Sequence, residues 1–289
     1  MTRASFDFDA IGTRWQIETA EPLDEATRRA VAHRIESFDH AYSRFRTDSL
    51  VARIAAEAGR FDFPDDAVEL FGLYDKLHSA TRGAVDPLVG RDLEQLGYDR
   101  VYSLQPSAVP DASPRASWAT DVARDGSTVT TTRPLVIDVG AVGKGYLVDL
   151  VRAVLEERGI DDVVIDASGD LVHRGATGIR VGLEHPLDPT KAIGVAEFAN
   201  ASLCASASNR RAWGDGLHHI LDARTGNPAR EVIATWVVAA DTALADGLAT
   251  ALFFTGAHEL ANTFHFSYVR MYADGRAERS RYFPGELFT

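Results

Sequence analysis

Short runs of β-branched and apolar residues, separated by glycine and other turn-forming residues, fill the chain from about residue 117 onwards. Such runs are typical of β-strands, so this part of the chain is expected to form a sheet. The runs are TVTTT after an Asp125-Gly126 turn, LVIDVG, DDVVIDASGD, GIRVGLE, HHILDA and EVIATWVVAA. One helix, predicted from Lys144 to Arg158 with a stop at Gly159, interrupts them.

The preceding part of the chain has the three- and four-residue spacing of apolar side chains that indicates helices. A strand candidate, GTRWQIE, comes first. Three helices are then predicted: one containing Val31, Ile35, Phe38, Tyr42 and Phe45, one capped at Thr47 or Asp48 and ending at Gly59, and one from Pro64-Asp65-Asp66 to Gly83. We therefore predict an α+β fold in which packed helices cover a mixed or antiparallel sheet. Its helix-rich part covers about 20–100 and its sheet-rich part about 117–289, within a single domain spanning 1–289.

The composition limits the kinds of partner. Of the 289 residues, 42 are acidic and 30 are Lys or Arg, which gives a formal net charge of −12. This charge repels nucleic acid and anionic membranes, whereas a phosphate-containing ligand would favour a bridging divalent cation. A single cysteine, Cys204, excludes an intramolecular disulfide. The chain shows no membrane-spanning stretch and no signal-peptide pattern, so we predict a cytoplasmic protein without membrane insertion.

The segment DTALADGLATALFFTG, residues 241–256, is a predicted helix with one charged residue in an apolar, small-residue-rich surrounding. Helical spacing puts Thr242, Asp246 and Thr250 on one narrow stripe. A carboxylate and a hydroxyl one turn apart suit a hard cation such as Mg²⁺ or Ca²⁺. Pairing of Asp246 with a buried arginine, or capping of a neighbouring segment, explains the pattern equally well at this point.

Two further segments have polar groups in positions that suit a binding site. In IDVGAVGKGYLVD a predicted buried strand leads through a glycine-rich bend into a helix, with Asp138 before the bend and Lys144 after it. Such a bend suits an anion, although tight packing alone also explains the glycines. In HHILDARTGNPAR one of two adjacent histidines can face a site, and His219 near Asp222 is the candidate. Asp86, before Pro87, is interpreted most simply as a capping residue of a turn.

Taken in order, seven segments resemble the sequence blocks of the FAD:protein FMN transferases, the ApbE-like flavin transferases. They are GTRWQI, YSRFRTDSLVARI, GAVDPLVG, DVGAVGKGYLVD, DASGDLVHRG, HHILDARTGNP and ADGLATALFFTG. The resemblance implies a single ApbE-like, T-fold-like domain that binds FAD as a substrate together with Mg²⁺. It also implies transfer of FMN to a Thr or Ser hydroxyl of an acceptor protein, with release of AMP.

The resemblance also implies roles for individual residues. It assigns the metal to the side chains of Asp246 and Thr250 and to the backbone carbonyl of Ala141. His219 becomes a candidate acid or base near the reacting phosphates. The residues implied in FAD binding are Ile11, Phe45, Ala84, Val85, Asp86, Asp138, Lys144 and Leu221.

Some segments depart from the usual family pattern. This chain has ASASN at residues 205–209 where the family has Thr-Ser-Gly followed by an aromatic residue, Asp222-Ala223 where it has Asp-Pro, and Gly143 where it has alanine. These changes leave the implied metal set intact but affect the acceptor side. Two alternatives therefore accompany the transferase hypothesis: an Mg²⁺-dependent FAD pyrophosphatase that yields FMN and AMP, and a non-catalytic FAD-binding protein.

Overall fold

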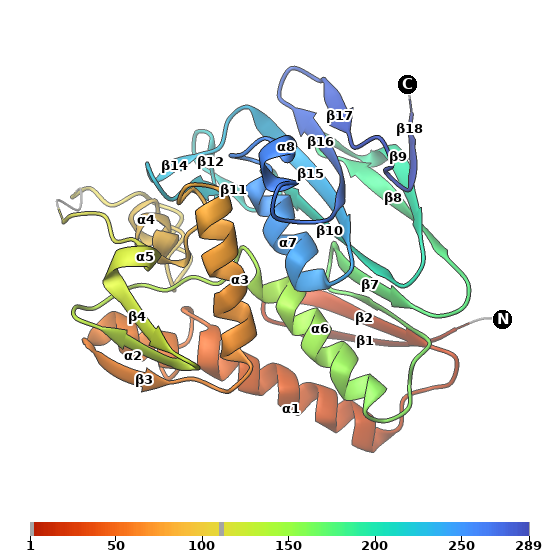
Figure 1. Cartoon of the computed structure of the whole chain (residues 1–289), viewed down its shortest axis with the longest axis horizontal. Helices are drawn as coiled ribbons and strands as arrows, with labels where there is room; N and C mark the ends of the chain where they lie inside the picture. Colours follow the sequence, from red (N-terminus) through yellow and green to blue (C-terminus); the bar gives the residue numbers. More distant parts are fainter. Residues whose placement is uncertain (1–2, 110–112, 289) are drawn as a thin grey trace.

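The computed structural model describes residues 3–109 and 113–288. An eight-stranded sheet runs through the molecule in the order β1-β2-β6-β7-β10-β15-β16-β17 (Figure 1). Its strands are β1 (Ala4–Ala10), β2 (Thr13–Thr19), β6 (Val163–Asp166), β7 (Asp170–Arg174), β10 (Ala201–Ala207), β15 (Val232–Ala239), β16 (Ser267–Tyr272) and β17 (Ala277–Arg279). Each strand pairing found in the described residues is antiparallel. The predicted α+β fold is confirmed, and its sheet is antiparallel.

Smaller sheets and helices complete the fold. The smaller sheets are formed by β8 (Ile179–His185), β9 (Asp188–Phe198) and β18 (Gly285–Leu287); by β3 (Gly59–Asp62), β4 (Val122–Asp125) and β5 (Thr128–Thr131); by β11 (Ala212–Trp213) and β12 (Leu217–His218); and by β13 (Leu221–Asp222) and β14 (Asn227–Pro228). The helices are α1 (Glu25–Tyr42), α2 (Leu50–Ala56), α3 (Ala67–Ala80), the 3₁₀ helix η1 (Pro87–Val89), α4 (Gly90–Gln95), α5 (Trp118–Asp121), α6 (Gly143–Glu156), α7 (Thr242–Ala251) and α8 (Ala257–Leu260). No helix in the described part of the chain is long and apolar enough to cross a membrane.

The central strand β15 shows why the large sheet is buried on both faces. Successive side chains of a strand point to opposite faces, and here nearly all of them are apolar. Val237 belongs to the core on the helix side, whereas Trp236 and Val238 belong to the core shared with β8 and β9. The large sheet therefore lies between a helical layer and a second, smaller sheet.

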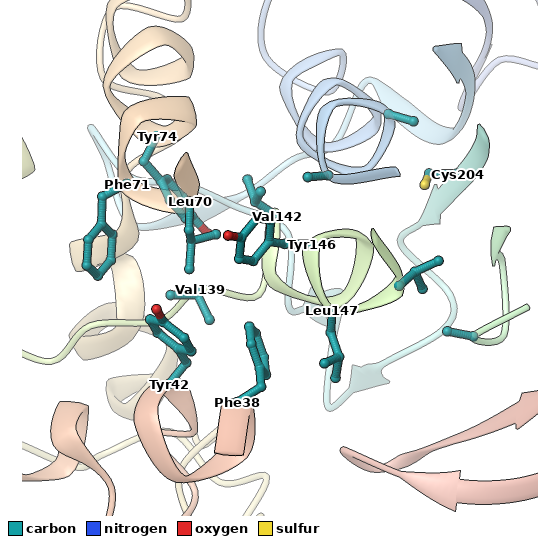
Figure 2. Packing of buried hydrophobic residues seen from close by; sticks show 14 of the residues in the cluster. Phe38, Tyr42, Leu70, Phe71, Tyr74, Val139, Val142, Tyr146, Leu147 and Cys204 are labelled. Atoms are coloured by element: carbon teal, nitrogen blue, oxygen red, sulfur yellow. The ribbon is translucent and has the colours of Figure 1, made fainter. Parts of the chain in front are cut away.

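The helix-side core joins segments that are far apart in the sequence. Figure 2 shows Phe38 and Tyr42 of α1 lying close to Val139, with Leu147 of α6 in the same region. Helix α7 packs on α6 and, through its other contacts, on β10 and β15. This packing fixes α7, which carries the unusual carboxylate, against the helix that follows the glycine-rich bend.

Three local predictions were wrong. The first helix ends at Tyr42, so Phe45 lies in the linker that follows it. The second helix is capped by Ser49, whose Oγ accepts from the Ala52 N–H at 3.1 Å, because the Asp48 carboxylate is paired with Arg46. That helix stops at Ala56, and Gly59 begins β3.

The predicted strand LVIDVG, residues 135–140, buries Leu135, Ile137 and Val139 but is not a β-strand. The N–H of Leu135 donates to the Ile54 carbonyl at 3.1 Å, and that of Asp138 donates to the Pro87 carbonyl at 2.7 Å. These acceptors belong to two separate segments, so no ladder forms. The segment nevertheless delivers Asp138 and the glycine-rich bend to the site described below.

Candidate functional site

A cavity of about 740 Å³ lies where the helical layer meets the large sheet. Its wall comes from the β1–β2 turn, the α1–α2 linker, the turn before η1, the bend before α6, the segment from β10 to β13, and α7. Every residue assigned a role from the sequence lines it: Ile11, Phe45, Ala84, Val85, Asp86, Asp138, Ala141, Lys144, His219, Leu221, Asp246 and Thr250. The structure thus brings these residues together, while the role of each one stays a prediction.

Asp246 is buried in the cavity wall, with 4% of its surface exposed. Its Oδ2 accepts from the Gly145 N–H at 2.9 Å. Burial raises the pKa of Asp246 well above its ordinary value, and the negative charge of Asp170 adds to this effect, while Lys144 opposes it. No described arginine pairs with Asp246, so the arginine partner considered from the sequence is absent from this part of the structure. A positive charge beside Asp246 that is not already paired with another carboxylate would lower the free-energy cost of ionising this buried side chain.

The other members of the predicted stripe on α7 differ in environment. Thr250 lines the cavity one turn beyond Asp246. Thr242 is fully buried and shares a hydrogen bond of 2.9 Å with the hydroxyl of Ser202. The Thr242 hydroxyl is therefore already hydrogen-bonded inside the protein. Of the three residues of the stripe, Asp246 and Thr250 line the cavity.

Lys144 occupies the wall between α6 and the large sheet. Its Nζ lies 2.9 Å from Oδ2 of Asp170 and 3.0 Å from the Ala167 carbonyl oxygen. Burial lowers the pKa of Lys144, but the carboxylates of Asp170 and Asp246 outweigh burial, and the pKa lies above its ordinary value. The ammonium therefore stays charged at neutral pH.

The glycines of the bend allow α6 to pack closely on α7, and their backbone N–H groups are mostly already hydrogen-bonded. A Cβ on Gly145 would lie 2.4 Å from the Thr242 carbonyl oxygen and 2.7 Å from Cβ of Asp246. The N–H groups of Gly143 and Gly145 already donate to Val139 and Asp246. Of the two explanations offered for these glycines, tight packing of α6 on α7 is the one that the geometry supports.

Ile11 holds an unusual backbone conformation at the edge of the cavity. Its φ is 45° and that of Gly12 is 74°, in the turn between β1 and β2. A β-branched residue rarely adopts a positive φ, and such strain costs about 1–3 kcal/mol. Strain of this kind is commonly found where a wall must be shaped for a ligand.

His219 and its neighbour His218 face different surroundings, as the sequence predicted. His218 is buried and its Nε2 lies 2.8 Å from the Ala229 carbonyl. His219 lines the cavity, and its buried Nδ1 has no hydrogen-bond partner among the described residues. Burial, followed by the charge of Arg211, lowers the pKa of His219 to about 3. Asp222 pairs with Arg224 at 2.6 Å instead of orienting His219.

Asp86 caps a turn and also lines the cavity. Its Oδ1 accepts from the Leu88 N–H at 2.8 Å, and its Oδ2 accepts from the Trp118 N–H at 2.9 Å. Nε2 of His78 lies 3.3 Å from the same carboxylate. Burial raises the pKa of Asp86 despite these donors. The capping interpretation is confirmed, and the capped turn follows directly on Ala84 and Val85 in the wall.

Sequence reasoning named Phe45 but missed Arg44, Tyr98 and Tyr102, which surround it in the cavity wall. The guanidinium carbon of Arg44 lies 4.3 Å from the ring centre of Phe45 and 5.0 Å from that of Tyr98. Tyr102 stacks on Phe45 at 5.0 Å with an interplanar angle of 3°. Nε of Arg44 donates to Oδ2 of Asp138 at 2.5 Å, and this ion pair keeps the pKa of Asp138 low although burial opposes it. An arginine between aromatic residues in YSRF was the available signal.

The chemistry of the site follows from two kinds of lining group. The Asp246 carboxylate, the Thr250 hydroxyl and the Ala141 backbone are hard oxygen donors suited to Mg²⁺. The described residues contain no group of three or more His, Cys, Asp or Glu side chains that would hold a metal ion by themselves. A cation here would need ligand oxygens, such as phosphate oxygens, to complete its coordination. The aromatic rings around Phe45 offer a surface to a planar group.

Comparison with known proteins gives a consistent result. The ApbE family model matches residues 11–269. A Klebsiella pneumoniae protein named "FAD:protein FMN transferase" is 26% identical over 88% of this chain and 79% of its own length. A Rhodobacter capsulatus protein of the same name is 29% identical over 86% of this chain, which spans 51% of that relative.

Solved structures show the same fold. The Thermotoga maritima ApbE protein aligns with a TM-score of 0.85 at 23% identity, over 97% of both chains. The flavin transferase ApbE from Vibrio cholerae aligns with a TM-score of 0.81 at 21% identity, again over 97% of both chains. The family match covers most of the chain and includes every residue of the predicted site. The chain belongs to the ApbE family.

Proposed function

We propose that this protein is an Mg²⁺-dependent transferase that moves FMN from FAD to a Thr or Ser hydroxyl of an acceptor protein and releases AMP. The observation that carries the proposal is the buried Asp246, which lines a cavity of about 740 Å³ together with Thr250 and Ala141. The relatives' names supply the reaction class.

The residues divide into three tasks. Asp246, Thr250 and the Ala141 carbonyl would hold Mg²⁺, which neutralises and polarises the phosphate oxygens. Lys144 adds a fixed positive charge in the same wall. The aromatic group around Phe45 offers a surface to a ring of the substrate. Most of the rate enhancement would come from positioning and charge stabilisation.

The transfer itself exchanges one bond for another. The acceptor oxygen forms a bond to the phosphorus of the FMN group while the bond from that phosphorus to the oxygen of AMP breaks. The hydroxyl proton must pass to a base. His219 is the candidate base because it lines the cavity and its Nδ1 has no partner among the described residues, and the anionic phosphates of a bound substrate would raise its lowered pKa towards the range that a base needs.

Asp246→Asn tests the proposal directly. The change keeps the side-chain size but removes the anionic ligand, so we expect FMN transfer to fall by about 100-fold or more while the protein stays folded. The measurement is flavin fluorescence of protein bands on a denaturing gel, after incubation with FAD, Mg²⁺ and an extract of cells that lack this gene. Asp241→Asn is the matched control, because Asp241 is exposed at the start of the same helix and makes no capping bond.

The same assay separates the alternatives. Sustained release of FMN and AMP without an acceptor would identify a pyrophosphatase. FAD that binds with Mg²⁺ and stays unchanged would identify a binding protein. Full activity in the Asp246→Asn variant would contradict the metal assignment.

A further inference from the structure

Asp170 is a fully buried carboxylate to which the reaction scheme gives no task. It is the last residue of the DASGD segment and the first residue of β7, where it pairs in register with Cys204 of β10. Its exposed fraction is 0%. An ionised carboxylate in such a place is costly unless a charge or several donors compensate it.

The positive charge that compensates the Asp170 carboxylate comes from one residue, Lys144. Lys144 Nζ lies 2.9 Å from Asp170 Oδ2, and the other polar neighbour of the Asp170 carboxyl group is the side chain of Asp246, which is close enough for a side-chain hydrogen bond. The Lys144 side chain, in contrast, is 23% exposed and lines the cavity. The pair therefore reaches from the interior of the sheet to the cavity wall.

The second carboxylate near this lysine is Asp246. It is connected to the next residue along α6, because the Gly145 N–H donates to Asp246 Oδ2 at 2.9 Å. Within the described part of the chain, Lys144 makes its ion pair with Asp170 and not with Asp246. Two carboxyl groups and one ammonium group thus share a small buried volume, and the carboxyl group that has no lysine or arginine ion pair is the one that lines the cavity.

We infer that Asp170 is a positioning residue that holds the Lys144 ammonium away from Asp246 and so keeps the Asp246 carboxylate available to a divalent cation. This inference rests on the proposed function and extends it to a residue outside the cavity wall. Without Asp170, the long and flexible lysine side chain would lose its buried counterion and turn to the nearest remaining one, Asp246. Lys144 would then compete with the cation for the Asp246 carboxylate.

The test measures cation affinity and does not depend on turnover. Binding of Mn²⁺ to the full-length protein is followed by electron paramagnetic resonance of the free ion, with FAD at saturation. Asp170→Asn keeps the shape of the side chain, and we expect it to weaken Mn²⁺ affinity by about 10–100-fold, as is typical for loss of an outer partner of a metal ligand. Asp121→Asn is the control, because Asp121 loses an ion pair with Arg133 at 2.6 Å and neither residue lines the cavity.

A double variant separates positioning from a purely structural role. If freed Lys144 is what blocks Asp246, then Asp170→Asn combined with Lys144→Met must recover Mn²⁺ affinity relative to Asp170→Asn alone. A structural role predicts a lower melting temperature, with no recovery in the double variant. Unchanged Mn²⁺ affinity in Asp170→Asn, or no recovery in the double variant, overturns the inference.

The same titration distinguishes this inference from the proposal on which it rests. Wild-type binding that is lost in Asp246→Asn supports the metal site whatever Asp170 does. Wild-type protein that binds no Mn²⁺ in the presence of FAD contradicts the proposed function itself.

Discussion

His219 and Asp246 are two titratable side chains whose pKa values the same cavity wall shifts towards the neutral form. Burial lowers the pKa of His219 to about 3 and raises the pKa of Asp246 above its ordinary value. Both shifts have one main cause, the penalty for placing a charge in a wall with little water. An anionic substrate and a cation would change both environments together, because each supplies a charge opposite to that of one ionised side chain.

The pKa of His219 leads to a prediction about stability. Between about pH 6.5 and pH 3 the unfolded chain binds a proton at this histidine that the folded chain does not bind, so the free energy of unfolding decreases as the pH falls through this range. The variant His219→Asn removes this contribution. We therefore expect urea denaturation at pH 7.0 and pH 5.0 to show a smaller loss of stability for the variant than for the wild type. If the variant and the wild type lose the same stability between pH 7.0 and pH 5.0, then the pKa of His219 is not lowered in the folded protein.

Individual residues also show where sequence reasoning succeeds and where it stops. The pattern around Asp246 predicted a buried carboxylate, because a single charge in an apolar helix is visible in the sequence itself. The partner of that carboxylate was not predictable, since Gly145 and Asp246 are 101 positions apart. Asp170 and Arg44 were missed for the same reason: a buried charge is recognised by its surroundings, and those come from distant segments.

At the scale of elements, the close contact between α6 and α7 depends on a glycine, Gly145, which has no side chain to separate the two helices. Gly145 lets the two helix backbones approach so closely that its N–H reaches the Asp246 carboxylate. Across the same contact, Asp149 of α6 accepts from the N–H groups of Thr242 and Ala243 at 3.1 and 2.8 Å. The first turn of α7 is therefore capped by another helix, although Asp241 stands at the sequence position that usually supplies the cap.

We expect Gly145→Ala to destabilise the protein and to weaken cation binding. The new methyl group would lie 2.4 Å from the Thr242 carbonyl oxygen, so the helices must separate and the bond to Asp246 must lengthen. Gly72→Ala in α3 is the matched control, since a methyl group there would meet no atom within 4 Å and alanine favours a helix by about 1 kcal/mol. Thermal denaturation should show the two variants shifted in opposite directions. A stable Gly145→Ala variant with normal Mn²⁺ binding would argue against the close helix contact.

Helices and strands were predicted well where the spacing of apolar residues was long and regular. They were predicted poorly where the backbone hydrogen-bond acceptors came from separate segments of the chain. Helices α1, α3 and α6 follow their apolar spacing, and the apolar run of β15 forms a buried strand. LVIDVG was misread because its alternation of buried side chains matches a strand, while its backbone partners are Ile54 and Pro87 in two different segments. Alternation of apolar and polar residues indicates that one face of the segment is buried. A β-ladder forms only if a neighbouring strand supplies the backbone hydrogen-bond partners.

At the scale of the whole molecule, the net charge of −12 bears on how the substrate enters. FAD carries a negatively charged pyrophosphate, and the field of an acidic protein repels it. The local positive charge of Lys144 is largely matched by Asp170. Arg211 also lines the cavity and donates to the Tyr98 hydroxyl at 3.0 Å, and a bound divalent cation would add its own attraction to that of this arginine.

This balance predicts that FAD and Mg²⁺ stabilise the protein together. A ligand present at about 100 times its Kd raises the free energy of unfolding by about 2.7 kcal/mol. We expect a clear increase in melting temperature with FAD and Mg²⁺ present, and only a small one with FAD and EDTA. Differential scanning fluorimetry measures both, and equal shifts under the two conditions would show that FAD binds without the cation.

The cavity wall takes residues from Ile11 in the first hairpin to Thr250 near the end of α7. A ribosome must therefore release most of the chain before this cavity exists and, under the proposed function, before a nascent protein can bind FAD. Until β15 and α7 have been made, α6 has no neighbour for Gly145 and the interior side of β10 is uncovered. Under the proposed function, binding of FAD then marks the completion of folding, and a nascent chain cut short before α7 is expected to be recognised by chaperones and proteases and not to bind flavin weakly.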